Sequence, residues 1–443
     1  MTQLEQLAKF VVRASHDNLS GAARESLKIR VLDSLGCAIG ALEGEPIKLV
    51  RQHTDDFGGN GYCTLIGGGR TAPDRAAFYN SALVRYLDFN DSFLAPGETC
   101  HPSDNLGAVL AATEYAGGGG RDFLTALAVA YQVQCRLSEV APVRDKGFDH
   151  TTQAAYGIAA GVSKALGLNQ EQTANAVAIA GTAFNALRVT RTGTLSHWKG
   201  LACPNTAFGA THGAFLAKRG ITGPFEIPWA QEQLDIALRT MVKRFNAETH
   251  AQSAIEGLLE LKREHQLTGT EVEQIHIETF DVAHQIIGGG EEGDKTVVRT
   301  KEQADHSLPF MLAVAVLDGQ IMPEQYVPER ICRDDAQHLL RKISVSVLPE
   351  FSRRFPDEMP CRVAVRLRDG REWTVAKRDF EGFPTRPMTW QTAAQKFEIL
   401  SRPFTDPVLR GEIVDAVAGL ELIPIAELTA LLARVRGHSQ NPN

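Results

Sequence analysis

The 443-residue chain lacks paired cysteines. Its seven cysteines are scattered singly, and no two of them have the Cys-x-x-Cys spacing of structural zinc sites and iron–sulfur clusters. We therefore expect no metal and no cofactor, so that any acid/base chemistry has to be carried out by side chains. Cys100 lies next to His101 and Cys203 lies near Lys199. We expect both to be packed free thiols rather than nucleophiles.

The chain also lacks long apolar runs and an excess of positive charge. No apolar stretch approaches the roughly 20 residues that span a bilayer, and the N-terminus has no basic segment followed by an apolar core. With 46 basic and 53 acidic residues the net charge is -7, which excludes a strong electrostatic attraction for nucleic acid or an anionic membrane. These absences predict a cytoplasmic enzyme whose partner is a small molecule, not a nucleic acid or a membrane.

Apolar periodicity divides the chain into two parts. Apolar residues recur at three- and four-residue steps through most of residues 1–267, which predicts helices. Ala- and Gly-dense stretches, such as 154–168 and 174–186, predict helices that approach one another closely. Helical spacing returns after residue 386.

Between these helical parts the pattern alternates with a period of two. It does so at 275–279, 343–347 and 363–375, where Asp369-Gly370 predicts a hairpin with a primed turn. The predicted fold class is mostly α with a smaller α+β domain. The predicted domains are a helical domain from 1–267 and 386–443, and an α+β domain from 268–385.

One polar cluster stands between apolar helical segments. His101-Pro102-Ser103-Asp104 follows Asp91 by ten residues, and Asp88 lies just before Asp91. Histidine titrates near neutral pH, and a nearby carboxylate can fix its tautomer. The cluster therefore predicts acid/base chemistry, with Asp91 orienting His101, although the same pattern also occurs in ordinary loops and helix caps.

Four further polar clusters follow, each with an imidazole or a cation. They are His150-Thr151-Thr152, the stretch 196–200 with Lys199, the stretch 243–253 with Lys243 and His250, and Asp305-His306-Ser307. Lys199 stands between Trp198 and an apolar run, a setting that favours binding a carboxylate over exposure to solvent.

In this order the clusters resemble the MmgE/PrpD family, which contains 2-methylcitrate dehydratase, cis-aconitate decarboxylase and iminodisuccinate epimerase. The resemblance extends from the first helices to Arg386-Pro387-Met388-Thr389-Trp390. It implies a homodimer associated largely through the helical domain.

The resemblance also implies site residues. Asp91, His101, His150, Lys199 and Lys243 match the acid/base and carboxylate-binding positions of the family. Three more residues, Asp88, Ser103 and His306, are predicted to bind substrate. Phe310 stands where several relatives have tyrosine, which disfavours decarboxylation that uses a phenol hydroxyl.

The predicted function is a hydro-lyase that eliminates water from a tricarboxylate such as 2-methylcitrate or citrate, as in the 2-methylcitrate cycle of propionate metabolism. His101 and His150 form the proton-transfer pair, and Lys199 and Lys243 stabilise the carboxylate on which charge develops. Within the family, cis-aconitate decarboxylation and iminodisuccinate epimerisation are the alternatives. Outside it, Asp88, Asp91 and His101 could ligate a divalent metal in a hydrolase, or the protein could bind a tricarboxylate without turnover.

Overall fold

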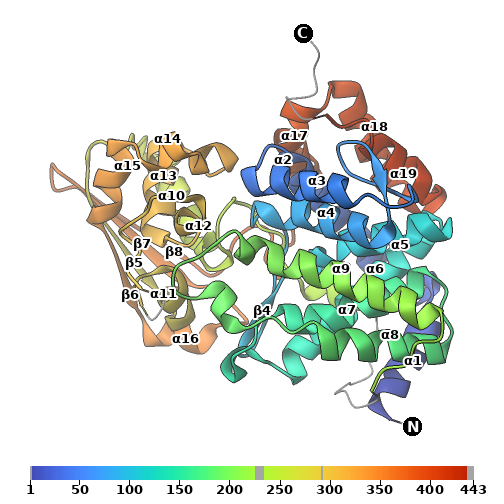
Figure 1. Ribbon diagram of the computed structural model, residues 1–443. Coiled ribbons are helices and arrows are strands. Elements are labelled where there is room, and N and C mark those ends of the chain that lie inside the picture. The colour runs from blue at the N-terminus through green and yellow to red at the C-terminus, as the bar shows by residue number, and fades with distance from the viewer. Residues whose placement is uncertain (1, 225–233, 291–292, 437–443) are drawn as a thin grey trace. The chain divides into compact units, whose positions relative to one another are not determined.

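The computed structural model describes residues 2–224, 234–290 and 293–436, and the chain divides into two compact units (Figure 1). The first unit comprises Met1–Arg191, His197–Val242 and Thr389–Asn443, and the second comprises Thr192–Ser196 and Lys243–Met388. Among the described residues, none of the helices combines the length and the apolar character that crossing a membrane requires.

The first unit is built from helices and two short hairpins. Its helices are α1 (Gln3–Arg13), α2 (Gly21–Gly40), α3 (Glu45–Phe57), α4 (Pro73–Tyr86), α5 (Leu106–Ala116), α6 (Gly120–Val140), α7 (Thr151–Ala165), α8 (Gln170–Ala183), α9 (Trp198–Lys218), α17 (Trp390–Ser401), α18 (Pro407–Ala418) and α19 (Ile425–Leu432). The hairpins pair β1 (Cys63–Thr64) with β2 (Arg70–Thr71), and β3 (Phe93–Ala95) with β4 (Glu98–Cys100).

Small residues set the spacing of the central helices. Helix α7 packs against α6, and a Cβ atom added at Gly161 would lie 2.8 Å from the Cβ atom of Ala130 and 3.0 Å from the carbonyl oxygen of Ala126. These separations are shorter than van der Waals contact, so a larger residue would push the helices apart. The close approach expected for the Ala- and Gly-dense stretches is therefore confirmed for this pair.

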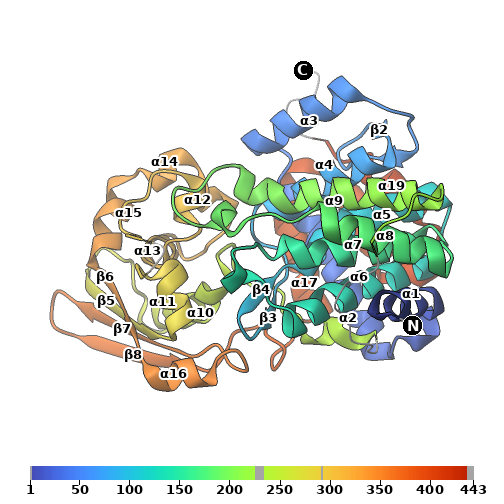
Figure 2. The same cartoon turned by 60° about the horizontal axis from the view of Figure 1, so that its bottom comes forward.

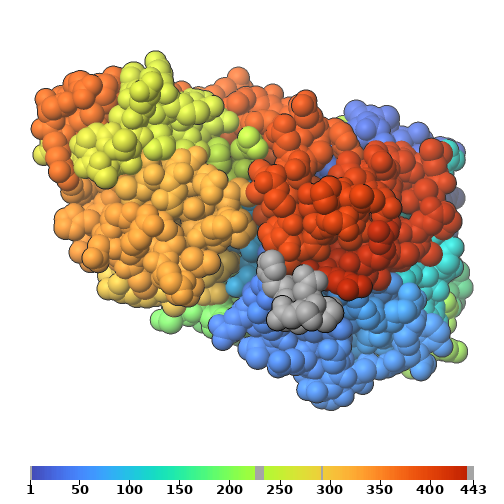
Figure 3. All heavy atoms as spheres, turned by 90° about the horizontal axis from the view of Figure 1, so that it is seen from above, coloured from blue at the N-terminus to red at the C-terminus, as the bar shows by residue number. Residues whose placement is uncertain are grey.

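A buried lysine connects the C-terminal helices to the N-terminal part of the first unit. Helix α17 packs against α2, and Figure 3 shows the red C-terminal helices beside the blue N-terminal segment. The Lys396 Nζ atom lies 2.6 Å from the Asp33 Oδ1 atom. It also donates a 2.7 Å hydrogen bond to the carbonyl oxygen of Phe89 and lies 3.7 Å from the centre of the Phe89 ring. Lys396 thereby fixes the backbone just after Asp88.

The second unit contains a four-stranded sheet of order β6-β5-β7-β8. The strands are β5 (Val272–Thr279), β6 (Ile343–Val347), β7 (Cys361–Leu367) and β8 (Glu372–Lys377), and β5 is parallel to β6 and antiparallel to β7. The helices are α10 (Gln252–His265), α11 (Asp281–Ile287), α12 (Lys301–Ala304), α13 (Leu308–Asp318), α14 (Pro328–Ile331), α15 (Asp334–Leu339) and α16 (Pro349–Arg354). Helices α10 and α13 lie against the sheet (Figure 2). The predicted fold class, mostly α with a smaller α+β part, is confirmed.

The predicted hairpin forms, but its turn differs from the prediction. Strands β7 and β8 pair with Val363 opposite Val375, as the alternating pattern indicates. Gly370 has a φ of 86°, whereas Asp369 is not among the residues of positive φ. A type I′ turn requires positive φ at both central residues, so the expected primed turn at Asp369-Gly370 is wrong. The loop is longer by one residue, and Gly370 alone adopts the left-handed conformation that closes it.

We predict that Lys396→Met lowers the free energy of unfolding by about 3–5 kcal/mol at neutral pH, because it leaves the Asp33 carboxylate buried without a cation. Burial raises the pKa of Asp33 to about 6, although Lys396 opposes this shift. Without Lys396 the pKa in the folded state rises further, while the unfolded chain titrates near 3.8. As the pH falls through the raised pKa, the folded variant binds a proton and its loss of stability shrinks.

Urea unfolding of variant and wild type at about pH 7.5 and about pH 5.5 measures this difference. Arg402→Met is the control, since Arg402 pairs with Glu398 on the surface and such pairs contribute at most about 1 kcal/mol. An equal loss of stability at both pH values would contradict the assigned role of Asp33.

Candidate functional site

Asp88 is held in the first unit between two cations. Helix α4 ends at Tyr86, and Asp88 follows with a φ of 52°, a left-handed conformation that short polar residues tolerate. Its Oδ1 atom accepts a 2.5 Å hydrogen bond from Arg85, and its Oδ2 atom lies 3.6 Å from the Lys199 Nζ atom. Burial alone would lower the pKa of Arg85, but Asp88 and Asp104 raise it above its usual value. Arg85 therefore stays charged inside the protein.

Asp91 organises the segment that carries His101. One carboxylate oxygen accepts a 2.9 Å hydrogen bond from the backbone N–H of Ser103, and the other accepts a 2.7 Å hydrogen bond from the Tyr131 hydroxyl. Burial raises the pKa of Asp91, and these hydrogen bonds and Arg30 oppose that shift. The Ser103 side chain accepts a 2.8 Å hydrogen bond from the Asn90 amide. Asp91 thus joins the end of α4 to the turn after β4.

His101 is oriented by a backbone carbonyl. Its Nδ1 atom lies 2.8 Å from the carbonyl oxygen of Asp91 and 3.1 Å from the Ser92 hydroxyl. Because a carbonyl oxygen only accepts, Nδ1 carries the proton, and Nε2 is the nitrogen with a lone pair in the neutral ring. The contact from Asp91 to this imidazole is made by its carbonyl oxygen, whereas its carboxylate accepts hydrogen bonds from Ser103 and Tyr131. Asp91 performs the role through its main chain.

His150 lies next to His101. The two ring centres are 5.4 Å apart and the rings are inclined at 69°. His150 precedes α7 and is buried, and neither of its ring nitrogens has a hydrogen-bond partner among the described residues. Burial lowers the pKa of His150 to about 3, despite the opposing effect of Asp149. The imidazole is therefore neutral at physiological pH.

Arg191 forms an ion pair with Asp149, the residue that precedes His150. Its Nε atom donates a 2.6 Å hydrogen bond to Asp149, and a second nitrogen donates to the carbonyl oxygen of Lys199 at 3.2 Å. Burial would raise the pKa of Asp149, but Arg191 and then His150 lower it below its usual range. The same arginine thus connects Asp149 to the first turn of α9, where Lys199 is buried.

In the second unit, Lys243 and His306 lie near a buried carboxylate. Burial would raise the pKa of Glu248, but His250, then His306 and Lys243, lower it to about 2. Glu248 is 2.8 Å from the His250 Nδ1 atom. The His306 Nδ1 atom lies 2.7 Å from Asp305, the residue that also accepts a 2.8 Å hydrogen bond from Lys301.

The predicted site residues thus form two groups. The first unit contains Asp88, Asp91, His101, Ser103, His150 and Lys199, and the second contains Lys243 and His306. Sequence reasoning did not assign Arg85, Tyr131, Asp149 and Arg191 in the first group, or Glu248 and His250 in the second. Arg85 precedes Asp88 by three residues at a helix end, and Asp149 is adjacent to His150. These spacings were the available signals, whereas nothing local to Tyr131 or Arg191 points to a distant carboxylate.

Two alternatives, a cysteine nucleophile and a metal site formed by Asp88, Asp91 and His101, receive little support from this geometry. Cys100 and Cys203 are buried free thiols, as expected, and burial raises the pKa of Cys203 well above its usual value, which disfavours the thiolate. Asp88 already pairs with the cations Arg85 and Lys199, so the set Asp88, Asp91 and His101 is poorly suited to hold a further divalent cation. The first group instead offers two adjacent imidazoles, one lysine, the buried Arg85 and the half-buried Arg191.

Comparison with known proteins identifies relatives of matching length. The chain is 28% identical to a 2-methylcitrate dehydratase of Escherichia coli K12 over 386 residues, which cover 76% of each chain. It is 27% identical to a mitochondrial 2-methylcitrate dehydratase of Yarrowia lipolytica, with 79% of this chain and 74% of the relative covered. It is 25% identical to a cis-aconitate decarboxylase of Mus musculus, with 85% and 82% covered.

Two family profiles match in chain order. The MmgE/PrpD N-terminal domain matches residues 5–237, and the MmgE/PrpD C-terminal domain matches residues 245–422. The two matches cover most of the chain and include the candidate site residues described above except Lys243, which lies between them. This protein belongs to the MmgE/PrpD family.

Proposed function

We propose that the protein is a cofactor-independent hydro-lyase that eliminates water from a tricarboxylate such as 2-methylcitrate or citrate and forms an aconitate-type alkene. The observation that carries the proposal is the pair of buried imidazoles, His101 and His150, whose ring centres are 5.4 Å apart. Elimination of water needs one group to remove a C–H proton and another to protonate the leaving hydroxyl. Two adjacent imidazoles can divide these tasks.

The two imidazoles differ in their readiness to bind a proton. His101 has its Nδ1–H anchored on a carbonyl oxygen, so Nε2 is the ring nitrogen whose lone pair can accept a proton. The pKa of His150 is lowered to about 3, primarily by burial. A bound tricarboxylate would bring negative charge close to His150 and raise its pKa. His150 would therefore gain proton affinity only when substrate is present.

Lys199 is the proposed cation for the substrate carboxylate beside the breaking C–H bond. Negative charge grows on that carboxylate as the proton leaves, and a buried ammonium group stabilises it more strongly than water does. Asp88 lies 3.6 Å from the Lys199 Nζ atom and acts as a positioning residue. Lys243 and His306 retain their proposed carboxylate-binding roles on the basis of the family motifs.

The relatives support dehydration as the leading proposal, because several are named 2-methylcitrate dehydratase. One relative is named cis-aconitate decarboxylase, so decarboxylation is the alternative within the family, together with iminodisuccinate epimerisation. Phe310 is fully buried on α13 and has no hydroxyl group, and the hydroxyl of its neighbour Tyr326 donates to the carbonyl oxygen of Asn246. The missing hydroxyl group at Phe310 and the engaged hydroxyl of Tyr326 disfavour decarboxylation that uses a phenol, and this supports dehydration.

Incubation of the purified protein with 2-methylcitrate, citrate, cis-aconitate or iminodisuccinate tests the proposal. We expect ultraviolet absorbance of an alkene to appear with a hydroxy-tricarboxylate, and NMR of the products to identify it. Activity should survive dialysis against a chelator, because side chains perform the proton transfers. Release of carbon dioxide from cis-aconitate, racemisation of iminodisuccinate without an alkene product, or a loss of activity that added metal restores would each reject it.

We predict that His101→Asn lowers kcat by roughly 10²–10⁴-fold with little change in KM. The asparagine amide can replace Nδ1–H as the donor to the Asp91 carbonyl, so the loop keeps its anchor while the Nε2 base is lost. Steady-state kinetics over the pH range measures the effect, and the limb of the pH–rate profile that reports this imidazole should move or disappear.

His338→Asn is the control for this variant, because His338 is exposed on α15 and has no proposed role. Near-normal turnover of a folded His101→Asn protein would show that His101 transfers no proton.

We predict that Lys199→Met lowers kcat/KM by about 2–4 kcal/mol of transition-state stabilisation. The decrease should appear in both KM and kcat, because the ammonium group binds the substrate carboxylate and its growing charge. Lys218→Met, at the last turn of the same helix, provides a matched loss of charge and should leave both constants unchanged. A Lys199→Met enzyme with wild-type kcat and KM would exclude the lysine from the reaction.

A further inference from the structure

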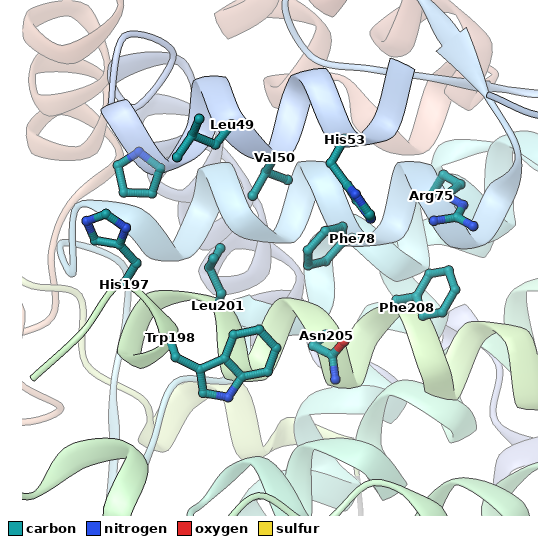
Figure 4. A pocket seen from close by; sticks show the side chains of 11 residues that line it. Leu49, Val50, His53, Arg75, Phe78, His197, Trp198, Leu201, Asn205 and Phe208 are labelled. Carbon is teal, nitrogen blue, oxygen red and sulfur yellow. The ribbon is translucent and has the colours of Figure 1, made fainter. Parts of the chain in front are cut away.

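A hollow of about 340 Å³ lies in the first unit, apart from His101 and His150. It is formed between α3, α4 and α9 (Figure 4). Helix α3 contributes Leu49 and His53, α4 contributes Arg75 and Phe78, and α9 contributes Trp198 and Phe208. None of the residues assigned to the proposed reaction lines it.

Arg75 lies at one end of this hollow without a counterion. Its guanidinium carbon lies 5.0 Å from the centre of the Phe57 ring and 5.1 Å from the centre of the Phe208 ring. Among the described residues the Arg75 guanidinium forms no ion pair. The adjacent carboxylate of Asp74 lies 3.7 Å from His212 instead. A guanidinium group held by ring faces keeps N–H groups at its edge that match an oxyanion.

The remaining walls are mostly aromatic and aliphatic, with His53, His197 and Asn205 among them. The Phe78 and Phe208 rings meet edge to face at 6.5 Å, and His53 contacts the Phe78 ring at 6.4 Å. Trp198 is 47% exposed, an unusual degree for the side chain that buries the most apolar area. Figure 4 shows Arg75 and Phe208 together at one end and Trp198 below Leu201. Aromatic rings therefore line much of the hollow.

The ionisable side chains that line the hollow are all basic. The ionisable residues that line the hollow are His53, Arg75 and His197, and no aspartate or glutamate lines it. An anion is therefore electrostatically matched to this surface. Its volume lies at the lower end of the roughly 300–1,000 Å³ range of small-molecule sites, and its concave shape suits a compact ligand.

We propose that this hollow is a second binding site, which takes a small organic anion with a planar ring. The ring lies against Trp198 and Phe78, and the carboxylate, sulfonate or phosphate group binds the edge of Arg75. This ligand differs in class from the aliphatic tricarboxylate of the proposed reaction, which has no ring to stack. Trp198 directly precedes Lys199 in the first turn of α9, so a ligand bound to Trp198 restrains the turn that carries Lys199.

Titration with 8-anilinonaphthalene-1-sulfonate, an anionic planar probe, tests this site without measuring any enzyme activity. We expect saturable binding to one site and energy transfer from tryptophan to the probe. Trp198→Phe should remove most of that transfer. Arg75→Met should raise the Kd of the probe roughly fivefold or more, the scale of one charge-assisted hydrogen bond. The uncharged analogue N-phenyl-1-naphthylamine should bind wild type and Arg75→Met equally and weakly.

Arg121→Met is the matched control, since Arg121 is exposed in the first turn of α6 and does not line the hollow. It should leave the Kd unchanged, and circular dichroism confirms the fold of each variant. Equal affinity of wild type and Arg75→Met for the sulfonate would overturn the proposal, as would equal affinity of wild type for the two probes. Binding that disappears as the protein concentration rises would also overturn it, because a second copy of the chain would then cover the hollow.

Discussion

The burial of the Asp88 carboxylate in a left-handed turn is the constraint on which the rest of the first unit's polar group depends. A carboxylate removed from water costs several kcal/mol unless cations and hydrogen bonds compensate it. Arg85 and Lys199 approach its two oxygens, and this fixes the end of α4 relative to the start of α9. The same loop carries Asp91, whose carbonyl and carboxylate groups set the positions of His101 and Ser103. The burial of this one carboxylate thus determines the arrangement of four segments. They are the end of α4, the loop that carries Asp88 and Asp91, the turn that carries His101 and Ser103, and the start of α9.

His150 is compensated less completely than the buried carboxylates near it. Asp149 has Arg191 and Asp33 has Lys396 within ion-pair distance, whereas the His150 Nε2 atom lies 3.8 Å from a carboxylate oxygen of Asp149. The nitrogens of His150 lack hydrogen bonds among the described residues, and burial suppresses the ring's charge. An unsatisfied buried polar group costs about 1–3 kcal/mol. In an enzyme such a cost is recovered when a ligand supplies the missing partner, which is consistent with the proposed role of His150.

Local patterns in the sequence predict the elements of this fold better than they predict the contacts of the site. Periodicity predicts the pairing of β7 with β8, because the alternation and the turn depend on neighbouring residues. The turn at Gly370 departs from the prediction, since one added residue changes the conformation required of Asp369. Motif order places Asp91 beside His101, but it does not reveal that the main chain orients the imidazole. The partners Tyr131 and Arg191 are 40 and 42 residues from the carboxylates they bind, a separation that only tertiary packing can specify.

The contact between Lys396 and the Phe89 carbonyl joins residues 307 positions apart. Synthesis proceeds from the N-terminus, so the loop containing Asp88 and Asp91 leaves the ribosome long before α17 exists. At about 5–20 residues per second, the nascent first unit waits tens of seconds with Asp33 lacking its cation. The entire second unit is made in that interval. A stalled or truncated chain would therefore contain His101 and His150 but lack Lys396, which holds the loop that orients His101. The first group is completed only when translation has passed α17.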